Sequence, residues 1–340
     1  MLSKTIRAIA RRIPAYVKAL PPQTLGVENT ESVEVGAVHF GAYNFNYRVK
    51  VDGKEFIFRV NVDQQSGLPH QVEYEFNALK FLEGHEIGPR VYHLDNTRDC
   101  FEYGVLIEEY LAGPPLTLRG DEIPRICELL VRLHSLDPGD ISWMVWDDPL
   151  RDTYDQARRD LRAYRRKPTS DGSLIRLAAS VLAETKPWID SHCELFRADS
   201  VNHTDLAFDN FIKCSRGLRL IDWEKPRIDD ASYDLGCLLS EPVQLWCAHL
   251  SEIKLGREQK EGFLAAYADL SGVDSGLLSE KVALREPLIS LHWILWGATK
   301  LCDLRDRDTA PQFAQVHQSS RRRYERLADS RNVERILDST

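Results

Sequence analysis

The sequence predicts an α+β fold built from two lobes, a small β-rich N-terminal lobe followed by a larger, mostly helical C-terminal lobe. Residues 31–111 carry runs of alternating β-branched and aromatic residues, whereas residues 112–340 are dominated by apolar residues at helical spacing. The breakers Ala-Gly-Pro-Pro at 112–115 separate the two patterns. Proteins of this organisation commonly bind their ligand in the cleft between the lobes, so we expect the functional site there.

The composition excludes several classes of protein. The 340 residues are 43% hydrophobic and carry a net charge of −8, which argues against a general nucleic-acid binder because such proteins need an excess of Lys and Arg. No apolar run approaches the roughly 20 residues that a membrane span requires. The seven cysteines are scattered without a C-x-x-C pair, which favours reduced thiols. Since no apolar signal-peptide core is visible, we expect a cytoplasmic protein.

Residues 1–30 form a basic amphipathic N-terminal segment. The first 20 positions hold five Lys or Arg residues and no carboxylate, and apolar residues repeat at helical spacing from Leu2 to Leu20. This pattern predicts a helix despite Pro14. Two interpretations stay open: the helix packs on the body of the protein, or it associates with an anionic membrane surface.

The N-terminal lobe, residues 31–111, is expected to be a nucleotide-binding sheet with one helix. Asp52-Gly53 between two alternating runs is a strong hairpin signal. The strands are expected at 33–35, 45–51, 55–60, 90–94 and 103–109, and the helix at 71–83.

The C-terminal lobe, residues 112–340, is expected to hold the acceptor site. Its helices are expected at 121–136, 153–166, 173–192, 235–250, 257–270, 277–301 and 310–328. One β-rich island interrupts them, with two short strands at 210–214 and 218–222 on either side of Gly217.

This β-rich island carries the residues with the clearest chemistry. The pattern H-x-D-x-x-x-x-N runs from His203 through Asp205 to Asn210, and Asp222 follows at the end of an apolar strand. In phosphoryl transfer, an Asp on a loop can orient the acceptor hydroxyl and accept its proton, while an amide and a second carboxylate can hold Mg²⁺. A short hairpin brings Asn210 and Asp222 together because they sit at opposite strand ends.

At these residues the sequence resembles the aminoglycoside phosphotransferase and choline kinase family, which has the fold of protein kinases. The family pattern H-G-D-x-x-x-x-N matches residues 203–210, I-D-W-E matches 221–224, and y-D-L-A matches 233–236. Residues 106–113 resemble the family's hinge. The resemblance spans roughly residues 33–300, and it implies that ATP and Mg²⁺ are used to phosphorylate a hydroxyl of a small molecule.

The resemblance also implies a role for each matching residue. Asp205 would be the catalytic base, and Asn210 and Asp222 would bind the metal. His203 and Asp234 would support the site structurally. Nucleotide binding would involve a cation on the third strand, its partner on the following helix and two hinge residues, which are Arg59, Glu75, Glu109 and Leu111.

The identity of the acceptor stays open. Glu224, Trp293 and Trp296 are candidates for acceptor binding, although Glu224 also suits an exposed position and tryptophans at this spacing are also typical of a core. The two tryptophans resemble the W-x-x-W helix of choline and ethanolamine kinases, where aromatic faces contact a quaternary ammonium. A cationic acceptor, such as an amino alcohol or an aminoglycoside, would suit the acidic residues Asp229, Asp230, Glu241, Asp303, Asp306 and Asp308.

Three departures from the family pattern keep a second interpretation open. Thr204 replaces the usual Gly, Arg59 replaces Lys, and the loop 36–44 lacks G-x-G-x-x-G. These changes suit a nucleotide-binding regulator without turnover, whereas the retained base and metal ligands argue against it. Protein-kinase activity is disfavoured, because the 11 residues between Asp222 and Asp234 are too few for an activation segment.

Overall fold

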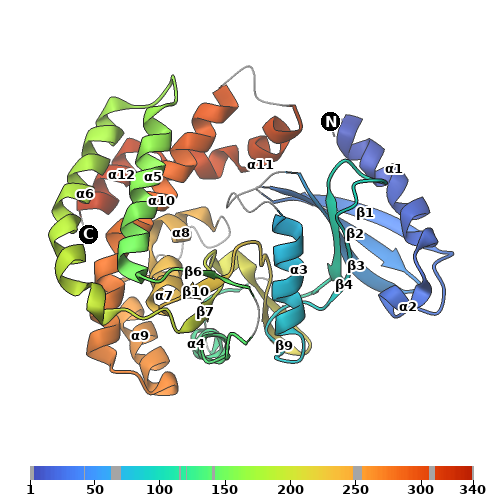
Figure 1. The fold of residues 1–340 in the computed structure, drawn as a ribbon, viewed down its shortest axis with the longest axis horizontal. Coiled ribbons are helices and arrows are strands. Elements are labelled where there is room, and N and C mark those ends of the chain that lie inside the picture. Colours follow the sequence, from blue (N-terminus) through green and yellow to red (C-terminus); the bar gives the residue numbers. More distant parts are fainter. Residues whose placement is uncertain are drawn as a thin grey trace. The chain divides into compact units, whose positions relative to one another are not determined.

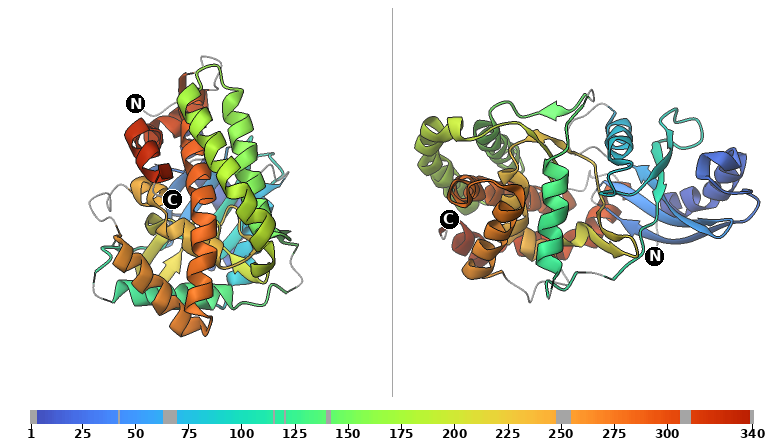
Figure 2. Two further views of the ribbon diagram at one scale, coloured as in Figure 1. Left: turned by 90° about the vertical axis from the view of Figure 1, so that its left-hand side faces the viewer. Right: turned by 90° about the horizontal axis from the view of Figure 1, so that it is seen from below.

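The computed structural model describes residues 4–41, 43–62, 70–114, 116–119, 121–139, 142–247, 255–305 and 311–338. The chain divides into two compact units (Figures 1 and 2). Unit 1 comprises Met1–Gly113, Arg219–Lys225 and Asp308–Ser320, and unit 2 comprises Pro114–Leu218, Pro226–Arg307 and Arg321–Thr340. A β-sheet forms the N-terminal part and helices dominate the C-terminal part, which confirms the expected fold class.

Unit 1 is built on a five-stranded antiparallel sheet with the order β1-β2-β3-β5-β4. Tyr47 lies opposite Phe58 in the register and Asn46 lies opposite Arg59, so the apolar pair and the polar pair occupy opposite faces. The expected strands are all present, and the first extends five residues beyond its expected end. They are β1 (Val33–Phe40), β2 (Asn44–Val51), β3 (Lys54–Asn61), β4 (Val91–Asp95) and β5 (Gly104–Glu109).

Helices cover both faces of this sheet (Figure 1). On the apolar face, α1 (Lys4–Ala19) buries four residues to 3% exposure or less, and α2 (Pro22–Leu25) follows it. The four are Ile6, Ile9, Ile13 and Val17. On the polar face, α3 (Gln71–Leu82) directs Glu75 toward Arg59. The apolar side of α1 is therefore part of the protein's own core, which bears out the packed interpretation and leaves the membrane interpretation without support.

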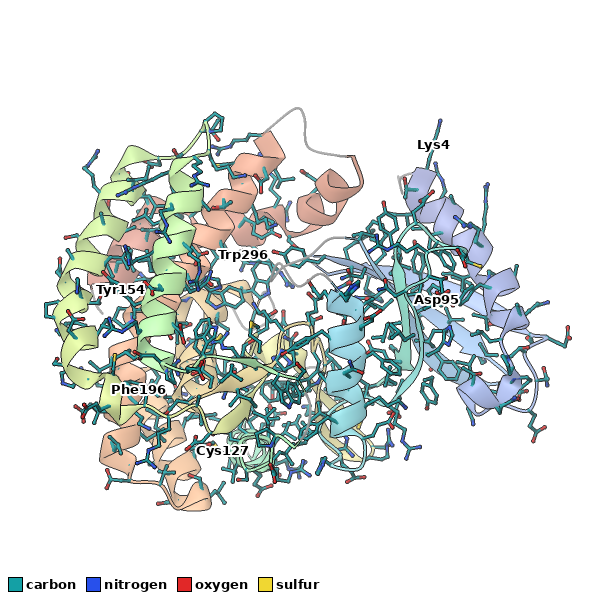
Figure 3. The ribbon with its side chains drawn as sticks, in the orientation of Figure 1. Lys4, Asp95, Cys127, Tyr154, Phe196 and Trp296 are labelled. Carbon is teal, nitrogen blue, oxygen red and sulfur yellow. The ribbon has the colours of Figure 1, made fainter. Side chains whose placement is uncertain are left out.

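Unit 2 is mainly helical. The core of unit 2 contains Tyr154 and Phe196, both labelled in Figure 3, among apolar residues of α5, α6, α10 and α12. One helix, α11, begins in unit 1 and ends in unit 2. The helices are α4 (Glu122–His134), α5 (Pro149–Arg165), α6 (Gly172–His192), α7 (Ser232–Leu239), α8 (Glu241–Trp246), α9 (Arg257–Ser271), α10 (Ser275–Arg305), α11 (Pro311–Leu327) and α12 (Ser330–Asp338). No helix among the described residues is long and apolar enough to cross a membrane.

Two expectations for the helices were wrong. The single helix expected at 235–250 is two helices, α7 and α8, because the chain extends at Ser240 and Pro242 starts a new helix; residues 248–250 lie outside the described part. The C-terminal α12 was not expected.

Short strands position the predicted catalytic loop. β7 (Ser200–Asn202) pairs with β10 (Arg227–Asp229), which also pairs with β6 (Met144–Val145). The expected hairpin is present as β8 (Phe211–Cys214) and β9 (Gly217–Leu220). Residues 203–210 therefore run from a buried strand into this hairpin.

Candidate active site

A buried carboxylate holds the backbone of the loop that follows β7. Asp234 of α7 is fully buried and accepts the backbone N–H groups of His203 and Thr204, each over 2.8 Å. It also lies 3.2 Å from His134 Nε2, and because a carboxylate only accepts, that nitrogen carries the proton. Burial raises the pKa of Asp234, but these donors outweigh it and the pKa lies below its ordinary value. Asp234 is therefore an ionised brace of the loop.

The brace acts where the backbone is strained. Thr204 has a φ of +66°, in the left-handed region that disfavours a residue with a branched Cβ. This is the position at which the resembling family carries Gly. The two backbone hydrogen bonds to Asp234 offset the conformational cost at this residue.

The strain predicts that Thr204→Gly is more stable than Thr204→Ala by about 1 kcal/mol. Both variants lose the same atoms beyond Cβ, so the difference isolates the effect of a Cβ at positive φ. Urea unfolding measures it. The matched control is Ser180 in the middle of α6, where Ser180→Ala should be more stable than Ser180→Gly. If the Ala variant were the more stable one at position 204 as well, Thr204 would not be strained.

The loop also ties the predicted base to a predicted metal ligand. The backbone N–H of Asp205 donates to His203 Nδ1 over 3.3 Å, and its carbonyl accepts from Asn210 Nδ2 over 2.9 Å. Because a carbonyl only accepts, Asn210 turns its NH₂ group toward it, and Oδ1 is the atom that Asn210 can present to a cation. His203 is fully buried and contacts the loop backbone, as a structural residue does.

A second cluster lies in unit 1, around the guanidinium of Arg59 on β3. Arg59 is 3% exposed and contacts the carboxylates of Glu75 and Asp222, and its Nη2 lies 3.1 Å from Glu224. Glu224 is itself 3% exposed and also accepts from Asn44 and Gln71. Of the two alternatives left open for Glu224, the exposed position is therefore wrong. Its contacts are those of a structural partner of Arg59.

Sequence reasoning missed a fourth carboxylate of this cluster. Glu108 of β5 is 7% exposed and acts electrostatically on both Arg59 and Glu75. The register places Leu106 opposite Arg59, so Glu108, two residues further, shares its face of the sheet. The alternation of side chains along β5 was therefore the signal that could have identified Glu108.

The crowding of carboxylates changes their titration. Burial raises the pKa of Glu75 to about 8, although Arg59 acts in the opposite direction, and Glu108 adds to the rise. Burial likewise raises the pKa of Glu108 to about 7, again against the effect of Arg59. Near neutral pH this cluster is therefore partly protonated.

These shifts predict a stability that falls with rising pH. Between the ordinary carboxyl value of 4.5 and about 8, the folded protein retains a proton on Glu75 that the unfolded chain has released. The free energy of unfolding should therefore decrease across this window. Urea titrations at several pH values should show a flatter slope for Glu75→Gln and an unchanged slope for Glu280→Gln, an exposed control; equal slopes in all three proteins would contradict the assignment.

The donor atoms suit a hard divalent cation. Asp222 of unit 1 offers a carboxylate oxygen and Asn210 of unit 2 offers an amide oxygen. Both are ligand types that Mg²⁺ takes, usually with only one or two from the protein and the rest from water and phosphate. Among the described residues there is no group of three or more His, Cys, Asp or Glu that could hold a metal without such additional ligands. Asp222 has a φ of +73°, so the backbone is strained here as well.

The hinge residues lie at the end of β5. Glu109 is half-buried, and its backbone N–H donates to the carbonyl of Arg90 over 2.8 Å. Leu111 follows in an extended segment and is half-buried. Their predicted contact with the nucleotide stays a prediction, as does coverage of the phosphates by residues 36–44, of which residue 42 is not described.

The two predicted tryptophans belong to one aromatic cluster in unit 2. Trp293 is 6% exposed, whereas Trp296, labelled in Figure 3, is half-buried, and their ring centroids are 5.6 Å apart. Trp246 and Tyr324 complete the cluster. The guanidinium of Arg323 lies 4.9 Å from the Trp246 ring and 3.3 Å from Asp209, so a cation of the chain itself already contacts these rings.

The acidic residues expected to favour a cationic acceptor are mostly paired. Asp229 contacts Arg227 and Arg285, and Asp230 contacts Lys281. Glu241 and Asp303 contact Arg335 and Lys167, respectively. Asp306 and Asp308 lie outside the described residues.

The sheet, the helical part and the braced loop define a kinase-like phosphotransferase. A family model described as the phosphotransferase enzyme family matches residues 34–276, and the chain belongs to this family. No sequence among the curated proteins matches the chain.

Solved structures support the kinase-like fold. An ethanolamine kinase from Plasmodium vivax has 15% identity and a TM-score of 0.63 and covers 95% of this chain and 89% of its own. A choline kinase from Cryptosporidium parvum has 16% identity and a TM-score of 0.63, with coverages of 96% and 97%. An aminoglycoside-3'-phosphotransferase of type VIII has 23% identity and a TM-score of 0.53, with coverages of 85% and 97%.

Proposed function

We propose that the protein is an ATP- and Mg²⁺-dependent kinase that phosphorylates a hydroxyl group of a small molecule, with Asp205 as its catalytic base. The observation that carries this proposal is the loop around Asp205. Asp234 holds its backbone at the strained Thr204, and Asn210 is tied to the carbonyl of Asp205. Backbone strain of this kind persists only where the surrounding structure maintains it, and it is found mostly at functional sites.

The residues would divide the chemistry among them. Asp205 orients the acceptor hydroxyl and takes its proton as the new bond to phosphorus forms. Asn210 Oδ1 and the Asp222 carboxylate would each offer an oxygen to the cation. Bound Mg²⁺–ATP would supply the phosphoryl group, and the metal would neutralise part of its negative charge.

Arg59 would contact a phosphate by exchanging one of the carboxylates at its Nη atoms, because its remaining donor, Nε, is buried. Asp222 is the candidate to leave, because its side chain is 30% exposed whereas those of Glu75 and Glu224 are 1% and 3% exposed. The exchange would release Asp222 for the cation. Glu75 would then keep Arg59 in place, and Glu109 and Leu111 would meet the nucleotide at the hinge.

The acceptor class is proposed from the family and the aromatic cluster. Relatives of the same fold are named for ethanolamine, choline and aminoglycosides, so an amino alcohol or an aminoglycoside is the first class to test. Trp296 offers more surface than Trp293 for a contact with such an acceptor. We place nucleotide binding in residues 31–111 and acceptor binding in residues 112–340. We also propose a cytoplasmic location, which the seven free cysteines favour.

The test is ADP release from Mg²⁺–ATP with a panel of hydroxyl acceptors. The panel contains choline, ethanolamine, aminoglycosides, sugars and amino acids, each run beside Asp205→Asn. Release that needs both an acceptor and Asp205 would support the proposal. A lack of both turnover and nucleotide binding would refute it.

The alternative is a nucleotide-binding regulator that does not turn over. The observation that favours it is the contact of both Arg59 Nη atoms with carboxylates of three residues, which leaves these two nitrogens without a phosphate contact until one of the carboxylates moves. Tight Mg²⁺–ATP binding in calorimetry, with no acceptor-dependent ADP release across the panel, would support this alternative.

A further inference from the structure

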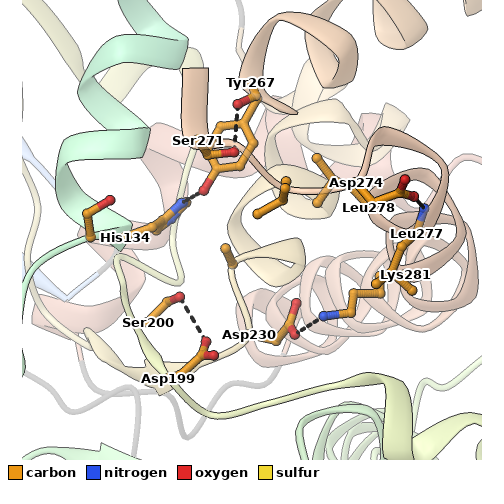
Figure 4. A pocket seen from close by; sticks show the side chains of 13 residues that line it. His134, Asp199, Ser200, Asp230, Tyr267, Ser271, Asp274, Leu277, Leu278 and Lys281 are labelled. Carbon is orange, nitrogen blue, oxygen red and sulfur yellow. Dashed lines mark hydrogen bonds and ion pairs between the residues drawn. The ribbon is translucent and has the colours of Figure 1, made fainter. Parts of the chain in front are cut away.

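A cavity of about 370 Å³ lies within unit 2, and its lining includes neither Asp234 nor a residue of the loop 203–210 (Figure 4). Its walls come from the ends of several elements: Ser135 after α4, Ser200 of β7, Ala231 before α7, Ser271 at the end of α9 and Leu278 of α10. A volume of this size accommodates a small organic molecule of the kind that proteins bind in clefts.

Two buried groups at this cavity are bonded to the catalytic loop's brace. Tyr267 and His134 both line the cavity, and the Tyr267 hydroxyl lies 2.8 Å from His134 Nδ1 (Figure 4). Since Nε2 of His134 carries a proton toward Asp234, Nδ1 accepts the hydroxyl proton of Tyr267 in the neutral imidazole. A continuous chain of hydrogen bonds therefore leads from the cavity through Asp234 to the backbone of His203 and Thr204.

The polar lining favours a positive charge. Asp230 and Lys281 form an ion pair of 2.7 Å and offset one another, which leaves the carboxylates of Asp199 and Asp274 as the net charge of the wall. The cavity meets the C-terminal ends of α4 and α9 and also the N-terminal ends of α7 and α10, so the helix ends give no net preference and the preference for a cation rests on the two carboxylates. The oxygen of the Tyr267 hydroxyl, which donates to His134, can accept a hydrogen bond from an ammonium group.

The remaining lining is apolar and partly open to solvent. Val273 is 47% exposed and Leu277 is 38% exposed, although both are large apolar side chains, and Leu278 lies buried beside them. Exposed apolar residues beside a hollow are typical of a ligand site. A ligand with an apolar body would cover them.

We propose that this cavity binds a small organic cation, an amine with an apolar body, and that binding stiffens the catalytic loop through Tyr267, His134 and Asp234. The ammonium group lies against the carboxylates and the Tyr267 hydroxyl, and the apolar body covers Val273 and Leu277. The binding step is independent of the proposed function, whereas an effect on turnover rests on it.

The test of binding uses cyclohexylmethylamine, which has no hydroxyl to phosphorylate, and cyclohexanecarboxylate as its anionic counterpart, in calorimetry with the full chain. We expect the amine to bind the unaltered protein and Asp205→Asn alike, and the carboxylate to bind at least tenfold more weakly. Leu277→Trp, which fills the rim, should weaken amine binding at least tenfold, whereas Leu270→Trp, an exposed control outside the lining, should not. Equal binding of the two probes, or equal binding by the two Trp variants, would overturn the site.

The test of coupling is amide hydrogen exchange at His203 and Thr204. The amine should slow exchange at both amides at least threefold in the unaltered protein. Tyr267→Phe, which also loses the hydroxyl contact with the ammonium group, should bind the amine more weakly and should show no protection even when it is saturated with the amine. Binding without any change in exchange would overturn the coupling. Neither calorimetry nor hydrogen exchange measures ADP. The amine site can therefore be refuted while acceptor-dependent ADP release is observed, and the amine can bind even if no acceptor-dependent ADP release is found.

Discussion

Asp205→Asn is expected to lower the rate of phosphoryl transfer by about 10²- to 10⁴-fold, the range that a positioned general base contributes. Asn keeps the size and shape of Asp, but its amide cannot accept the proton of the acceptor hydroxyl. The hydrogen bonds of the backbone N–H and carbonyl of residue 205 to His203 and Asn210 survive the substitution. The loss should therefore appear in turnover rather than in folding.

Three measurements separate the chemistry from the structure. Acceptor-dependent ADP release reports turnover, calorimetry reports Mg²⁺–ATP binding, and urea unfolding reports stability; only the first should change for Asp205→Asn. Asp155→Asn on α5, where the carboxylate is solvent-exposed and paired with Arg158, is the matched control and should turn over normally. Near-normal turnover of Asp205→Asn would remove the base from the mechanism.

Elements with strong local patterns could be predicted from the sequence. The hairpin of β2 and β3 follows from alternation around Asp52-Gly53, and α1 follows from apolar residues at helical spacing. The strands β6, β7 and β10 were missed because each has only two or three residues, too few for a period to show. They exist because residues far apart in the chain pair with one another, which no local pattern records.

In the candidate site, too, the residues that could be predicted lie close together in the sequence, whereas contacts between residues far apart in the sequence could not be predicted. The spacing of Asp205, Asn210 and Asp222 predicted a catalytic hairpin, because these residues follow one another in a short stretch of chain. The bond from Tyr267 to His134 joins residues 133 positions apart, and no local pattern in the sequence predicts that these two side chains meet. Glu108 could have been predicted as a neighbour of Arg59 once the β3–β5 register was known, because alternation along β5 places both side chains on the same face of the sheet.

Asp234→Ala is expected to lower the free energy of unfolding by about 3–5 kcal/mol, the usual loss when one partner of a buried charged network is removed. The substitution leaves two backbone N–H groups and the Nε2–H of His134 without their acceptor in a fully buried place. It also removes what holds Thr204 at positive φ. Asp234→Asn should lose less, about 1–3 kcal/mol, because one amide oxygen can still accept.

The control is Glu241→Gln, which weakens a partly exposed pair with Arg335 and should cost less than about 1 kcal/mol. Urea unfolding of the three variants gives the order, and ADP release adds a second reading. Any Asp234→Asn that remains folded should still lose turnover, because the amide group cannot satisfy both His203 and Thr204 and the loop that carries Asp205 relaxes. An Asp234→Asn protein with full turnover would show that the reaction does not need the strained loop geometry. The braced loop around Asp205 would then no longer support the proposed function.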